Sequence, residues 1–88
     1  MPRTVDIEQI LTELEKSFDQ MLEHQRTKVL DTARRKNPQL TAEDIMNPEA
    51  FPEIYEDGPF NFEDGILSGM VSAQISVRAR LKQMLGDS

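Results

Sequence analysis

Proline is unevenly distributed along the chain, and its placement limits what the chain can fold into. Four of the five prolines lie between Pro38 and Pro59, while residues 3–37 and 60–88 contain none. Because proline disrupts a helix interior, only the two flanking stretches can each form one long helix. We therefore predict an all-α fold, an antiparallel two-helix hairpin in one helical domain (residues 1–88), with a helix over about 6–36, a loop over 37–61 and a helix over about 62–85.

The first stretch has the periodicity of an amphipathic helix. Its stripe recurs at spacings of three and four residues and comprises Ile7, Ile10, Leu11, Leu14, Phe18, Met21, Leu22, Gln25 and Val29. Asp6 or Thr4 can cap the start of this helix. We expect the helix to end near Lys36, because Asn37 precedes Pro38 and is disfavoured in helical geometry.

The connection between the helices is rich in proline and in acidic residues, and it contains two candidate helix starts. Thr41-Ala42-Glu43-Asp44 resembles a capping box, and Asn47-Pro48-Glu49 places proline at a first helical position. We expect short helical turns at both. The connection also holds much of the aromatic content of the chain, so we expect it to fold back onto the helices.

The last stretch carries two stripes. Its main apolar stripe comprises Ile66, Met70, Ala73, Val77, Leu81 and Met84. A second stripe, the small-residue seam, comprises Gly65, Gly69, Ser72, Ser76 and Ala79. Small side chains let helices approach closely, so we expect the seam to form a homodimer interface and two hairpins to form a four-helix bundle. Alternatively, the connection of the same chain packs over the seam.

The net charge of −6 comes from the middle of the chain. Residues 37–65 contain eight acidic side chains and no basic one. Such a segment repels nucleic acid and favours a basic protein partner. We expect exposed carboxylates of the connection to bind that partner, namely Glu49, Glu53, Glu56 and Asp57.

The residue types of the chain do not form a recognisable catalytic or metal-binding motif. Around His24, the only histidine, the helical neighbours Gln20 and Lys28 offer neither an orienting carboxylate nor a second ligand. The sequences Glu56-Asp57-Gly58 and Glu63-Asp64-Gly65 lack the ligand order of a calcium loop. No glycine motif for nucleotides and no nucleophile motif occurs. We expect no catalytic residue, no cofactor and no metal, and the chain is not predicted to be an enzyme.

The absence of cysteine predicts a reducing compartment. It excludes disulfides and thiolate metal sites. The first residues lack the apolar segment of a signal peptide, and the longest uncharged stretch, residues 65–77, is too short to span a bilayer. We expect a cytoplasmic protein.

These features favour a non-enzymatic protein–protein interaction module, such as an adaptor, a chaperone-like protein or a neutralising partner of a basic protein. It would act as a helical homodimer with an acidic surface. One alternative is a metal-binding or enzymatic site formed at the dimer interface, with Glu63 and Asp64 as the first candidates. The other is a nucleic-acid-associated regulator that uses the basic cluster Arg34-Arg35-Lys36.

Overall fold

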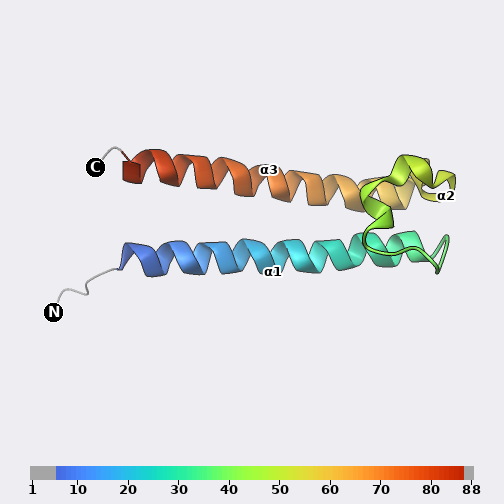
Figure 1. The fold of residues 1–88 in the computed structure, drawn as a ribbon, viewed down its shortest axis with the longest axis horizontal. Coiled ribbons are helices and arrows are strands. Elements are labelled where there is room, and N and C mark those ends of the chain that lie inside the picture. Colours follow the sequence, from blue (N-terminus) through green and yellow to red (C-terminus); the bar gives the residue numbers. More distant parts are fainter. Residues whose placement is uncertain (1–5, 87–88) are drawn as a thin grey trace.

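The computed structural model describes residues 6–86, and these residues form an antiparallel helical hairpin (Figure 1). The long helices are α1 (Ile7–Arg34) and α3 (Gly58–Gly86). Between them lie the 3₁₀ turns η1 (Asp44–Met46) and η2 (Pro48–Ala50) and the short helix α2 (Pro52–Tyr55). No strand occurs within residues 6–86, so the all-α prediction is confirmed for this part of the chain. The hairpin measures 57 × 25 × 19 Å.

Helix α1 begins and ends close to the predicted positions. The Asp6 carboxylate accepts hydrogen bonds from the backbone N–H groups of Glu8 (3.0 Å) and Gln9 (3.4 Å), as an N-cap does. The other candidate cap, Thr4, lies outside the described residues. The helix ends at Arg34, two residues before the predicted end, and Asn37 then leaves helical geometry before Pro38.

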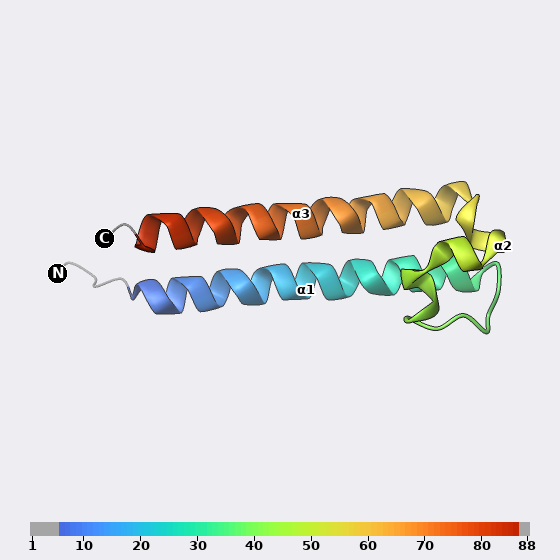
Figure 2. The same cartoon turned by 45° about the horizontal axis from the view of Figure 1, so that its top comes forward.

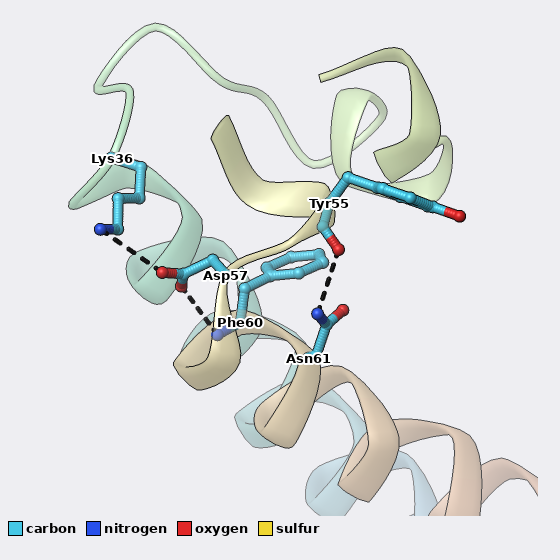
Figure 3. Close-up of polar contacts among 5 residues, drawn as sticks. All are labelled: Lys36, Tyr55, Asp57, Phe60 and Asn61. Atoms are coloured by element: carbon cyan, nitrogen blue, oxygen red, sulfur yellow. Dashed lines mark hydrogen bonds and ion pairs between the residues drawn. The ribbon is translucent and has the colours of Figure 1, made fainter. Parts of the chain in front are cut away.

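Helix α3 begins earlier than predicted, at Gly58 instead of near Asn61. A carboxylate oxygen of Asp57 accepts a hydrogen bond from the backbone N–H of Phe60 at 3.0 Å and so stabilises the first turn of α3 (Figure 3). Pro59 fits there because the first-turn N–H groups have no partner within the helix. The side chain of Asn61, the last residue of the predicted loop, donates a hydrogen bond to the backbone carbonyl of Tyr55 at 3.1 Å.

The hydrophobic core lies at the end of the hairpin that carries the connection. Its buried cluster joins both long helices to the connection and comprises Val29, Ala33, Leu40, Ile54 and Phe60, with Ile45, Phe51 and Leu67 packed against it. The connection therefore folds back onto the helices, as Figure 2 shows at the α2 end. At the opposite end the helices lie side by side without a third element, and none of residues 7–21 or 75–86 is buried.

Helix α3 faces α1 with a different side from its main apolar stripe. The helix–helix contact includes Phe60, Leu67 and the buried Gln74, while Ala73 and Val77 of the stripe are exposed. Two polar contacts fix this rotation. Gln25 donates to the backbone carbonyl of Glu63 at 2.9 Å, and Arg78 forms a two-pronged ion pair with Glu15, whose Nε–Oε1 distance is 2.7 Å. The main stripe therefore lies at the edge of the contact, where Val77 and Leu81 line a hollow together with Phe18 of α1.

The position of the core predicts unequal effects for two identical substitutions. Ile54 is fully buried and Ile75 is 59% exposed. Ile54→Ala should lower the free energy of unfolding by about 2–5 kcal/mol because it leaves a cavity in the core. Ile75→Ala, the matched control, should change it by about 0.5 kcal/mol or less. Urea denaturation followed by circular dichroism measures both, and equal losses would contradict this location of the core.

Candidate interaction surfaces

The small-residue seam lies on the outer side of α3, away from α1. Gly65, Gly69, Ser72, Ser76 and Ala79 are all exposed. A Cβ atom added at Gly65 or Gly69 would meet nothing within 4 Å. The connection therefore does not cover the seam, and the alternative in which it does so is wrong. Whether the seam is a dimer interface stays a prediction.

A second uncovered surface, here called the open face, lies on the side of the hairpin opposite η1. By helical spacing, the α1 residues of the open face lie on the same side of α1 as Lys28 and Thr32. Lys28 and Thr32 line a hollow together with Phe62 of α3. On the other side of the hairpin, Arg26 and Val71 line a hollow with η1. The open face comprises Ile10, Leu14 and Met21 of α1 and Phe62, Ile66, Met70, Ala73, Val77 and Met84 of α3.

Large apolar side chains of the open face are in contact with solvent in the single chain. Phe62 is 69% exposed, Met84 63% and Met21 48%. Single exposed apolar residues are ordinary, but apolar residues that follow one side of two adjacent helices, here interrupted by Arg80, mark an interaction site. The sequence prediction grouped most α3 residues of this surface into the main apolar stripe but did not say what the stripe contacts.

The four predicted partner-binding carboxylates differ in their surroundings. Glu49 and Glu56 are exposed. Glu53 is also exposed and accepts a hydrogen bond from Asn37 at 3.0 Å, which lowers the pKa of its carboxyl group. The Asp57 side chain is only 9% exposed and forms an ion pair with Lys36 at 3.4 Å (Figure 3). Asp57 therefore stabilises the start of α3, and the other three carboxylates face solvent.

The basic cluster at the end of α1 holds the connection in place. Arg34 donates from Nε to the backbone carbonyl of Leu40 at 2.8 Å. Lys36 pairs with Asp57, as described above, and Arg35 is exposed. Two of the three cationic side chains that a nucleic-acid surface would use are therefore engaged within the chain.

A hollow of about 570 Å³ lies between α1, α3 and the two 3₁₀ turns. Its apolar lining includes Val29, Ile45 and Leu67, and its charged lining includes Glu43 and Asp64 together with Arg26. Burial raises the pKa of the Asp64 carboxyl group above its ordinary value of 3.8. The hollow thus combines an apolar wall with a partly desolvated carboxylate, a combination that suits an aliphatic side chain ending in a cation.

Within the described residues, the candidate metal ligands do not gather into one site. No group of three or more His, Asp or Glu side chains within residues 6–86 is placed to hold a metal ion. His24 lies on the exposed side of α1 beside Asp19, Gln20, Glu23 and Thr27, in a shallow surface hollow. Glu63, a candidate ligand at a dimer interface, contributes its backbone carbonyl to the Gln25 hydrogen bond. Neither long helix is apolar enough over its described length to cross a membrane.

Comparison with protein-family models, curated proteins and solved structures gives no match for this chain.

Two carboxyl groups should affect stability in opposite directions. The Arg78 hydrogen bond lowers the pKa of Glu15, so the stabilising contribution of Glu15 is present at neutral pH and is lost as the pH falls through that lowered pKa. The pKa of Asp64 is raised, so ionised Asp64 destabilises the fold once the pH exceeds its folded-state pKa. At pH 7, Glu15→Gln should lower the urea midpoint, and Asp64→Asn should maintain or raise it.

The same denaturation series at lower pH provides the control. The difference between wild type and Asp64→Asn should shrink as the pH is lowered through the folded-state pKa of Asp64, because the wild-type group then becomes neutral. A marked loss of stability in Asp64→Asn at pH 7 would mean that the ionised carboxylate stabilises the fold.

Proposed function

We propose that this chain is a non-enzymatic protein–protein interaction module that acts as a homodimer of helical hairpins and presents an acidic surface to another protein. The observation that carries the proposal is the open face, which leaves apolar side chains of both long helices in solvent. The predicted setting is a reducing cytoplasm, which the absence of cysteine favours.

Self-association is supported by the mismatch between the small core and the length of the helices. The buried cluster lies at one end of a hairpin that is 57 Å long. Isolated helices are marginally stable in water, and most helical stability in proteins comes from packing of an apolar face. A second hairpin can supply that packing and complete a four-helix bundle.

Binding of a basic partner is supported by the distribution of charge. The connection carries an excess of carboxylates, and Glu49, Glu53 and Glu56 face solvent. Close by, the hollow beside Asp64 can receive the aliphatic stem of a lysine or arginine. An adaptor, a chaperone-like protein and a neutralising partner of a basic protein would all use such a surface.

The first test of the proposal is the molar mass in solution. Light scattering behind size exclusion, over a dilution series, should give twice the 10.1 kDa of one chain. The reason is that an uncovered apolar strip favours association with a second copy. A mass of one chain at every concentration, with the helical circular dichroism of the hairpin retained, would contradict the homodimer.

The second test concerns the acidic surface and uses defined probes. A synthetic amphipathic peptide of leucine and lysine should bind, and its affinity should fall steeply as salt is raised to about 0.5 M, because salt screens exposed charges. The same peptide with glutamate in place of lysine should not bind. Fluorescence anisotropy of the labelled peptides measures both.

Matched charge variants locate the binding surface. Replacing Glu49, Glu53 and Glu56 with glutamine should lower the affinity for the lysine peptide about tenfold or more, because charges close to the bound peptide attract it more strongly than distant ones. Replacing Glu8, Glu13 and Glu23 of α1 removes the same net charge and should have a smaller effect. Equal effects, or binding that is insensitive to salt, would contradict an acidic binding surface on the connection.

A further inference from the structure

We infer that two copies of this chain pair through their open faces, with the two-fold axis near Ala73 and the two connections at opposite ends of the bundle. The inference depends on the proposed homodimer and specifies its interface and orientation. It places the interface on the open face instead of the small-residue seam.

The first support is that most apolar residues of the open face are spaced symmetrically about Ala73 along α3; the exception is Ile66, whose symmetry position is Arg80. Phe62 and Met84 lie eleven residues before and after Ala73, and Met70 and Val77 lie three before and four after it. In an antiparallel pair of α3 helices centred on Ala73, Phe62 of each chain would lie level with Met84 of the other. Met70 and Val77 would meet with an offset of about 1.5 Å, one residue of helix rise. The small Ala73 at the centre would let the helices approach.

Two open-face residues of α1 are also spaced about the level of Ala73. Two polar contacts fix which levels of α1 and α3 coincide: Gln25 bonds to Glu63, and Glu15 pairs with Arg78. Interpolation between these contacts places Ala73 level with Phe18 of α1. The open-face residues Leu14 and Met21 lie four before and three after Phe18, so they would also pair across the same axis. An isologous interface requires this self-complementarity.

Charge distribution sets the orientation. The half of the hairpin that carries the connection, residues 19–72, contains eleven acidic and five basic side chains. The other half, residues 6–18 with 73–86, contains four of each. Connections at the same end would bring two strongly acidic halves together, whereas opposite ends place each acidic half beside a neutral one. Repulsion between like charges therefore favours the antiparallel arrangement.

The seam is the weaker candidate for the same role. Its glycine, serine and alanine side chains expose little apolar area, so solvent can cover the seam at small cost. The open face exposes phenylalanine, methionine and valine side chains, and burial of these provides most of the driving force for association. Both surfaces lie on α3, about 100° apart around the helix, so neighbouring positions can report on each separately.

Cysteine cross-linking tests the inference directly, because the chain has no native cysteine. Ala73→Cys places one thiol beside its symmetry mate, within the short Cα separation that a disulfide requires. Ser72→Cys, the matched control, places a thiol on the seam at nearly the same height. Under mild oxidation most of Ala73→Cys should become a covalent dimer on a non-reducing gel, and Ser72→Cys should remain mostly monomeric on the gel.

A second pair of variants checks the interface without cross-linking. Met70→Glu places a charge on the open face and should reduce the light-scattering mass toward one chain, whereas Ser72→Glu should leave it at two. If Ser72→Cys cross-links and Ala73→Cys does not, the seam is the interface, and only this inference is overturned. A dimeric wild type in which neither cysteine cross-links also overturns it, because α3 is then not paired with α3. A monomeric wild type overturns the proposed homodimer itself.

Discussion

The joint burial of Phe60, Ile54 and Leu40 against α1 is the constraint on which the rest of the structure depends. These residues are fully buried or nearly so, and they come from α3, α2 and the start of the connection. Their packing closes one end of the hairpin and fixes the rotation of α3, which the Gln25 and Arg78 contacts then maintain along its length. Once that rotation is set, Ile66, Met70 and Leu81 of the main apolar stripe are only half-buried within the chain, and Ala73, Val77 and Met84 stay exposed.

Electrostatic contacts support this arrangement more than they create it. Lys36 and Arg34 attach the connection to the end of α1, and Glu15 and Arg78 join the far ends of the helices. Exposed ion pairs of this kind contribute roughly 0–1 kcal/mol each, far less than the burial of a large apolar side chain. Their main consequence is specificity: they bring both ends of the hairpin into register and leave the remaining carboxylates of the connection exposed.

The two long helices could be predicted from the sequence because proline placement and 3–4 periodicity act locally. The cap at Asp6 could be predicted for the same reason, because an N-cap depends only on a suitable side chain immediately before the first helical residue. The start of α3 could not be predicted, because Asp57-Gly58-Pro59 has the composition of a turn and becomes helical only when Phe60 is buried. Likewise, periodicity shows which residues of α3 share a side, but not which neighbour each side meets. The open face therefore appeared only with the structure.

The central claim is that a second copy covers the open face and stabilises the half of the hairpin that has no core of its own. Hydrogen–deuterium exchange of the backbone amides in residues 11–20 and 76–85 tests it most directly. If the claim is correct, these amides are protected at concentrations where the chain is dimeric, and their protection falls on dilution, because local stability depends on the partner. Rapid exchange of these amides at every concentration, with protection confined to helix segments next to the connection, would contradict it.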